Sequence, residues 1–264
     1  MSFFVADQLT AGYGSKNFIE NISFHLEEGC LMGIIGANGS GKTTLLKAVC
    51  GILPHMGSCT LEQTVLEKQS ARRIARLVSY IPQRSGISID ISVLDVVLMG
   101  FNPRLGLLEH PTQQMKDAAV QALKMVGLSD MVQKNYVQLS EGQKQLFILA
   151  RTLVSEGKLL LLDEPESALD FRFRYQMLSL LRNWLMSGKR SAIVALHDPV
   201  LALNFCDKLL VLDEGGIAGV VEPRNDPIDK MEQLLGRVYG DVSLQWCKNR
   251  NGKEQLVLLR EDRT

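Results

Sequence analysis

Five short apolar runs limit most strongly what this chain can fold into. Four of them are nearly continuous, with turn residues or helical patterns after them; the runs are LMGII (31–35), LVSYI (77–81), LLLLD (159–163), SAIVAL (191–196) and KLLVLD (208–213). A strand that is apolar on both faces must be covered on both faces, as in a parallel sheet with helices on either side. We therefore predict an α/β fold around a parallel sheet.

A block of about residues 85–156 interrupts this pattern with apolar residues at helical spacing. The stretches are VLDVVLMGF, QQMKDAAVQALKMVGL and GQKQLFILARTLV, with GFNPRLG and GLSD as breakers. We predict a helical subdomain inserted into a sheet core of about residues 1–84 and 157–222. A short extension of about residues 223–264 follows, in which DVSLQWCK and KEQLVLLR flank an Asn-Gly turn and predict a β-hairpin.

The charge balance and the cysteines exclude several classes of function. Among 264 residues, Lys+Arg and Asp+Glu number 29 each, so no overall field attracts nucleic acid, and we expect no nucleic-acid partner. The five cysteines are scattered, without a CxxC or Cys/His spacing typical of a metal site, and we expect reduced thiols. We find no signal peptide and no apolar segment near the ~18 to 20 residues of a spanning helix. Any membrane role should come through another subunit.

Residues 36–44, GANGSGKTT, fit the phosphate-loop pattern GxxxxGK[ST] in the context that the pattern requires. They follow an apolar strand and lead into TLLKAVCGI, which is helical in period. Glycines let successive backbone N–H groups turn toward a phosphate, and the helix N-terminus adds partial positive charge. We predict that Lys42 reaches the outer phosphates and that the Thr43 hydroxyl binds Mg²⁺. The predicted nucleotide contacts are Gly36, Asn38, Gly39, Ser40, Gly41, Lys42, Thr43 and Thr44.

A second motif, LLLLDEPESALD at 159–170, ends a strand in two carboxylates. Asp163 is placed to hold Mg²⁺, and Glu164 to orient or deprotonate the attacking water. Adjacent residues at a strand end point apart, so the two carboxylates can differ in role. The alternative for DEP alone is a capped turn, and the preceding phosphate loop favours the functional interpretation.

A third motif, VQLSEGQKQ at 137–145, opens a helix with a Ser N-cap. With these three motifs in this order, the chain resembles the nucleotide-binding subunit of ATP-binding cassette transporters over nearly its full length. The resemblance implies a P-loop NTPase (RecA-like) core with an N-terminal antiparallel β subdomain, and ATP and Mg²⁺ as ligands. It also implies a dimer in which the signature of one subunit closes over the γ-phosphate bound by the other, through Ser140, Gly142 and Gln143.

The resemblance assigns roles to three further residues. Gln83, in SYIPQ, matches the glutamine that approaches Mg²⁺ and the attacking water and connects the site to the membrane subunit. His197, in VALHDP, matches the switch histidine that contacts the γ-phosphate, and Tyr13, in TAGYGSK, matches the aromatic residue that stacks on adenine. Without the resemblance they would be a surface residue after proline, a strand end before a helix cap, and a turn residue.

One residue departs from the usual signature, LSGGQ, because Glu141 occupies its third position. A carboxylate near a triphosphate should repel it unless the side chain turns toward solvent or a basic partner. We therefore expect an active site whose turnover rate depends on where Glu141 points.

The branch of the family is indicated by SARRIARLVSYIPQ, SVLDVVLMGFNPRLGLL and the tail PIDKMEQLLGRVYGDVSLQW. These resemble ATPase subunits of importers for iron chelates, haem, cobalamin and related metal-containing substrates. The resemblance implies two permease subunits as partners, a substrate-binding protein reached through them, and a place on the cytoplasmic face of the cell membrane. Gln83 and residues 84–110 should transmit closure to the permease.

The alternatives are a cassette ATPase that does not act in transport, an importer or exporter ATPase for another substrate, and a non-enzymatic regulator. A repair ATPase would carry a zinc or coiled-coil insertion, which we do not find in the sequence. A regulator would lack the catalytic carboxylate, whereas Glu164 is present.

Overall fold

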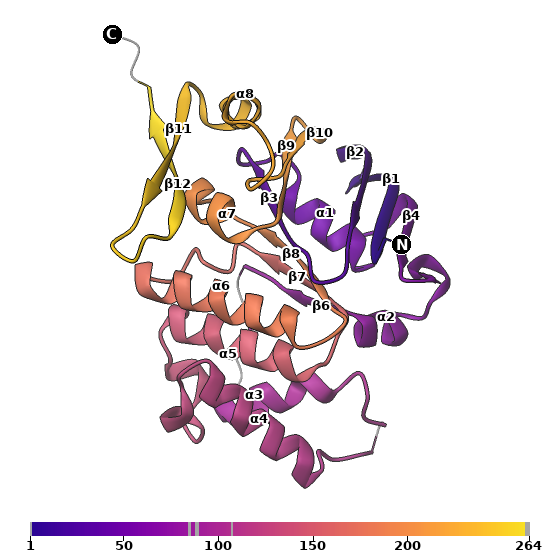
Figure 1. The fold of residues 1–264 in the computed structure, drawn as a ribbon. Coiled ribbons are helices and arrows are strands. Elements are labelled where there is room, and N and C mark those ends of the chain that lie inside the picture. Colours follow the sequence, from indigo (N-terminus) through magenta and orange to yellow (C-terminus); the bar gives the residue numbers. More distant parts are fainter. Residues whose placement is uncertain (1, 84–85, 88–89, 107, 262–264) are drawn as a thin grey trace.

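A parallel sheet forms the centre of the computed structural model, which describes residues 2–83, 86–87, 90–106 and 108–261 (Figure 1). Its strand order is β10-β9-β3-β8-β7-β6, and only the edge strand β10 runs antiparallel to its neighbour. The strands are β3 (Leu31–Gly36), β6 (Val78–Ile81), β7 (Leu159–Asp163), β8 (Ser191–Ala195), β9 (Lys208–Asp213) and β10 (Gly216–Val221). The five predicted strands are confirmed as one parallel set.

The two faces of this sheet pack into two different hydrophobic clusters, which explains the continuous apolar runs. In β7, Leu160 and Leu162 face one cluster, and Leu159 and Leu161 face the other. One cluster includes α3 (Val93–Leu98), α4 (Gln113–Met125), α5 (Glu141–Val154), α6 (Phe171–Met186) and α7 (Pro199–Phe205). The other includes α1 (Lys42–Val49) and the N-terminal strands. Both faces of the sheet are therefore buried, as the continuous apolar runs require.

The N-terminal antiparallel sheet has the order β2-β1-β4-β5 and lies beside α1 (Figure 1). Its strands are β1 (Phe4–Tyr13), β2 (Lys16–Leu26), β4 (His55–Leu61) and β5 (Thr64–Val65), and the short helix η1 (Leu66–Lys68) follows β5. The antiparallel subdomain implied by the resemblance is confirmed. The helix α2 (Ala71–Leu77) then leads into β6.

The helices α3, α4 and α5 gather at one end of the molecule (Figure 1). Short 3₁₀ helices connect them: η2 (Met99–Phe101), η3 (Ser129–Met131) and η4 (Tyr136–Gln138). These elements fall within the block predicted to be helical. The exact division of the chain stays a prediction, and its boundary at residues 84 and 85 lies outside the described residues.

The C-terminal segment contains α8 (Ile228–Tyr239) and a two-stranded sheet of β11 (Val242–Lys248) and β12 (Glu254–Arg260). This sheet is the predicted hairpin, and its turn contains the Asn251–Gly252 pair. Within the described part of the chain, no helix combines the length and apolar character needed to cross a bilayer.

Candidate nucleotide site

The loop between β3 and α1 requires glycine at two positions for different reasons. Gly41 has a φ of 101°, in the left-handed region that disfavours other residues, and a Cβ there would lie 2.5 Å from the Ile19 Cγ2 atom. A Cβ at Gly36 would lie 2.4 Å from the Ser40 Oγ atom and 2.6 Å from the Leu212 carbonyl oxygen. The loop backbone can therefore approach its neighbours only without side chains at these positions.

A pocket of about 250 Å³ opens beside this loop. Six loop or helix residues, Glu164 and two aromatic residues border it, and its lining is Tyr13, Phe18, Asn38, Gly39, Gly41, Lys42, Thr43, Thr44 and Glu164. The Tyr13 ring is about half exposed and packs edge-on against Phe18, with 5.6 Å between ring centroids. The pocket thus joins an aromatic wall at one side to a lysine, hydroxyls and backbone groups at the other, a combination suited to a base and its phosphates.

Asp163, the last residue of β7, is buried and accepts two hydroxyl hydrogen bonds. Thr43 Oγ1 donates to its Oδ1 atom over 2.9 Å, and the Tyr80 hydroxyl donates to its Oδ2 atom over 3.0 Å. Burial raises the pKa of Asp163, while these two hydrogen bonds oppose the rise. The predicted Mg²⁺ ligands Thr43 and Asp163 are therefore in direct contact.

Glu164 has a backbone φ of 50°, which is unusual for a residue with a side chain. Its Oε2 atom lies 2.7 Å from both Gln83 Nε2 and His197 Nε2. The Lys42 ammonium lies 3.8 Å from the Oε1 atom. Three residues predicted from separate motifs therefore meet at the Glu164 carboxylate.

Lys42 is almost completely buried and points back into its own loop. Its ammonium group donates to the carbonyls of Gly36, over 2.8 Å, and Ala37, over 3.2 Å. Phosphate oxygens are charged acceptors and bind an ammonium group more strongly than neutral carbonyls do. A triphosphate in the pocket would therefore compete for Lys42 with these two carbonyls and with Glu164.

Two contacts that sequence reasoning missed hold the residues around Glu164. Gln145, a buried residue of α5, donates from Nε2 to the Gln83 carbonyl. Glu166, 1% exposed, accepts from the His197 backbone N–H over 2.8 Å. Their motifs, LSEGQKQ and DEPES, gave no hint of these partners, because both contacts join segments far apart in the sequence.

The predicted signature residues form the start of α5. Ser140 and Gln143 make a reciprocal capping box, in which the Ser140 Oγ atom accepts from the Gln143 N–H and the Gln143 Oε1 atom accepts from the Ser140 N–H. Glu141 is mostly exposed and lies 2.8 Å from the Lys144 ammonium, which is the basic partner considered for it. Among the described residues, the pocket lining includes Lys42 and Glu164 but neither Ser140 nor Gly142.

The segment 84–110, predicted to transmit closure, starts directly after Gln83. Residues 84, 85, 88, 89 and 107 lie outside the described residues. Within the described part, Val93 and Val96 of α3 are completely buried in the same cluster as Phe147 of α5. A movement of α5 would therefore be felt in α3.

Comparison with known proteins shows the family to which the chain belongs. The profile of the ABC transporter family matches residues 19–167, which contain the phosphate loop, the signature and the two carboxylates. The chain belongs to the ABC transporter family. This ABC transporter subunit is thus an ATP-binding ATPase with the P-loop fold, as the motifs predicted.

Several relatives of this ABC transporter subunit are ATP-binding proteins of transport systems. It is 31% identical to the manganese transport system ATP-binding protein MntB of Listeria monocytogenes, over 90% of this chain and 97% of MntB. It is 34% identical to the hemin import ATP-binding protein HmuV of Bordetella pertussis, over 89% of this chain and 91% of HmuV. A solved structure of a metal-chelate type ABC transporter in an inward-facing conformation has a TM-score of 0.82 and 28% identity, and covers 99% of both chains.

Proposed function

We propose that the chain is the ATP-hydrolysing subunit of an importer for a metal-containing substrate, with Glu164 as the group that activates water. The observation that carries the hydrolytic role is the meeting of Gln83, His197 and Lys42 at the Glu164 carboxylate. A general base must be held within hydrogen-bond reach of the proton that it abstracts, and these contacts hold the Glu164 carboxylate beside the pocket that it lines.

In the proposed reaction, water attacks the γ-phosphate of ATP and the Glu164 carboxylate orients it or accepts its proton. Gln83 and His197 both contact the Oε2 atom of Glu164, so they fix the direction of the carboxylate and are close enough to reach the water or the phosphate. Lys42 contributes positive charge to the outer phosphates, and Tyr13 stacks on the adenine. Because little covalent chemistry falls to the protein, position and charge supply most of the rate.

The residues present fit a magnesium ion beside the phosphates. Thr43 and Asp163 offer a hydroxyl and a carboxylate oxygen 2.9 Å apart, which is the hard oxygen donor set that Mg²⁺ prefers. A bound Mg²⁺ would neutralise charge on the β- and γ-phosphates. The Tyr80 hydroxyl holds the second oxygen of Asp163 and so orients the carboxylate, and Gln83 would also help to hold the ion.

We further propose that two copies of the chain share two ATP sites. The pocket in one chain provides the loop, the carboxylates and the aromatic wall, and its lining includes no described residue from the signature. Ser140, Gly142 and Gln143 stand at the exposed or half-exposed start of α5, where they can cover the γ-phosphate of a partner. Glu141 does not oppose this arrangement, since its charge is paired with Lys144.

A mixing experiment tests the shared site. Lys42→Ala is defective in its own loop, and Ser140→Arg is defective in the signature that it lends. A heterodimer of the two has one site with both defects and one site with neither, so the mixture should hydrolyse ATP faster than either parent. If heterodimers form and the mixture hydrolyses ATP no faster than its parents, either the sites are not shared or the two sites do not work independently. Full activity in each single variant would refute the shared site itself.

The import role rests on relatives that serve manganese and hemin uptake and on the likeness to a metal-chelate type transporter. We propose two permease subunits, a substrate-binding protein that acts through them, and a position on the cytoplasmic face of the membrane. Capture of the tagged chain from solubilised membranes should retain a permease. In liposomes, that complex should couple ATP hydrolysis to uptake of an iron chelate, haem, cobalamin or a related metal compound.

Copurification with no membrane protein would contradict transport. Uptake of a substrate that contains no metal would contradict the proposed substrate class while leaving the transport role intact.

A further inference from the structure

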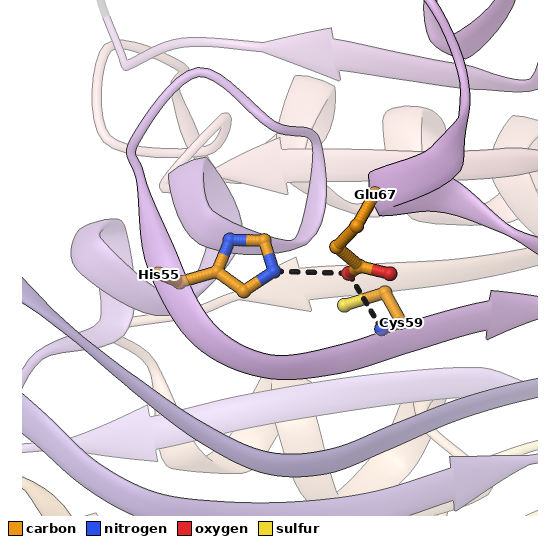
Figure 2. Close-up of side chains that lie close together, drawn as sticks. All are labelled: His55, Cys59 and Glu67. Atoms are coloured by element: carbon orange, nitrogen blue, oxygen red, sulfur yellow. Dashed lines mark hydrogen bonds and ion pairs between the residues drawn. The ribbon is translucent and has the colours of Figure 1, made fainter.

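Three potential metal ligands meet in the N-terminal sheet, away from the nucleotide site's carboxylates. They are His55 and Cys59 on β4 and Glu67 in η1, and their donor atoms all lie within 4.8 Å of one another. Figure 2 shows the His55 ring and the Cys59 side chain facing the Glu67 carboxylate across the hairpin. Within the part of the chain that the structure describes, this is the one such group of three or more His, Cys, Asp or Glu side chains.

The β4–β5 hairpin creates this group from residues that the sequence separates by up to twelve positions. Thr60 pairs with Val65 across the hairpin, so the chain returns beside Cys59 just before Glu67. The Glu67 Oε1 atom then accepts from the Cys59 backbone N–H over 2.7 Å. No Cys/His motif marks the group in the sequence, because its geometry comes from strand pairing.

The hydrogen bonds of His55 favour a cation between the imidazole and the carboxylate. The Nδ1 atom lies 3.3 Å from the Leu53 carbonyl, which can only accept, and this contact favours the tautomer that carries its proton on Nδ1. The Nε2 atom of a neutral ring then has a lone pair, and it lies 3.0 Å from the Glu67 Oε1 atom. Two lone pairs at that distance repel each other unless a proton or a metal ion lies between them. A backbone carbonyl on the remote ring nitrogen is also the usual support of a metal-binding histidine.

We propose that His55, Cys59 and Glu67 bind a divalent transition metal ion of the Zn²⁺ or Co²⁺ class. One imidazole nitrogen, one thiolate and one carboxylate oxygen suit these ions and not Mg²⁺ or Ca²⁺, which require oxygen ligands. The thiolate and the carboxylate together carry two negative charges, so a divalent ion makes the group neutral. Neutrality matters here because Cys59 is completely buried and the His55 side chain is only 8% exposed.

Metal binding at this group must release a proton. Cysteine binds a metal ion as the thiolate, so the Cys59 thiol must lose its proton when the ion binds. The ion displaces that proton to solvent and takes its place on the sulfur. Binding should therefore strengthen as the pH rises.

The ion can reach the group from the surface. The Glu67 side chain is 29% exposed, and His55 borders a pocket of about 530 Å³ whose lining also includes Tyr13 and Met56. With three protein ligands, a fourth coordination position stays open to water, as in catalytic zinc sites. His55 also pairs with Ala11 of β1, two residues before Tyr13, so the group adjoins the adenine side of the nucleotide pocket.

Cobalt absorption in the purified full-length protein tests this site. Titration with CoCl₂ without nucleotide should saturate at one equivalent per chain, with an absorption band from thiolate bound to Co²⁺ in the near ultraviolet. The nucleotide site cannot give this band, because Thr43 and Asp163 supply only oxygen. Cobalt binding should release a proton in weakly buffered solution, and ZnCl₂ should then displace the cobalt and abolish the band.

Variants distinguish this group from other thiols. Cys59→Ala should abolish the thiolate band. His55→Gln and Glu67→Gln should each weaken cobalt binding by about 100-fold, because loss of a group that only supports a metal ligand already weakens metal binding by up to about 100-fold. Glu67→Gln keeps an acceptor for the Cys59 N–H, so it tests the ligand with little risk to the fold. The controls are Cys30→Ala, at another buried thiol, and Cys247→Ser, at the exposed one. Both should bind cobalt as the unmodified protein does.

Two outcomes would overturn the proposal. Absence of a thiolate band at saturating Co²⁺ would mean that the three side chains form only a hydrogen-bonded cluster around a shared proton. A band that survives in Cys59→Ala and disappears in Cys247→Ser would mean adventitious binding at the surface thiol.

Discussion

Glu166 is a buried carboxyl group in contact with His197, and its replacement by glutamine should stabilise the protein at neutral and alkaline pH. Its Oε1 atom accepts from the His197 N–H, and its Oε2 atom has no hydrogen-bond partner among the described residues. Burial is the main cause that raises the pKa of Glu166, and the nearby Glu164 adds to it. Ionisation of this group is therefore costly in the folded protein.

The sign of the pH dependence follows from linkage. Since the folded chain holds the Glu166 proton more tightly than the unfolded chain, this group contributes its full stability below its ordinary pKa of 4.5. That contribution is lost as the pH rises through the raised pKa of the folded state. Glutamine does not titrate, and it keeps an acceptor for His197. The stability difference between Glu166→Gln and the unmodified protein should therefore grow above pH 4.5 and then level off.

The plateau should be about 1 to 3 kcal/mol, the range for a buried polar group left without a partner. For a chain of this size each kcal/mol corresponds to about 2 to 4 °C in melting temperature. Urea unfolding or thermal melts of both proteins, from about pH 5 to 9, measure the difference in their stability. The contributions of the other titrating groups cancel in this difference, because both proteins contain them. Glu28→Gln, at an exposed carboxylate, is the control and should change stability by less than about 0.5 kcal/mol. A difference that does not vary with pH, or that favours the unmodified protein as the pH rises, would refute the reasoning.

Three further substitutions test the nucleotide site. Lys42→Ala should weaken ATP binding about 10- to 100-fold, the equivalent of one lost charged hydrogen bond, in an equilibrium titration with a fluorescent ATP analogue; unchanged affinity would count against the phosphate loop. Glu141→Gly removes only an exposed pair with Lys144 worth about 0.3 to 0.5 kcal/mol, so steady-state ATPase rates should change less than about threefold; a large loss would reveal an unforeseen contact. Tyr80→Phe removes a donor to Asp163 and should raise the Mg²⁺ concentration for half-maximal activity by about 2- to 10-fold, with an identical Mg²⁺ titration arguing that the hydroxyl is idle.

The central sheet could be predicted because its strands are buried on both faces, so that LLLLD at 159–163 contains no alternation to misread. The phosphate loop, Asp163 and Glu164 could be located because their chemistry depends on local order along the chain. The partners of these residues could not, because Tyr80, Gln145 and Glu166 reach the site through tertiary packing.

The group of His55, Cys59 and Glu67 shows the same limit more clearly. The sequence offers a histidine and a cysteine at a spacing that suggests no metal site, and a glutamate among other polar residues. Only the pairing of β4 with β5 places the three together. Similarly, the left-handed backbone of Glu164 could not be foreseen from the sequence.

The central claim is that Glu164 activates the water that attacks ATP, and Glu164→Gln tests it most directly. Glutamine preserves the shape of the side chain but cannot accept the proton, so it should affect the transition state far more than ground-state binding. ATP affinity, ATP turnover and the oligomeric state in the presence of ATP should all be measured on the same Glu164→Gln preparation. We expect near-normal affinity, almost complete loss of hydrolysis and a lasting ATP-dependent dimer. Turnover close to that of the unmodified protein would contradict it.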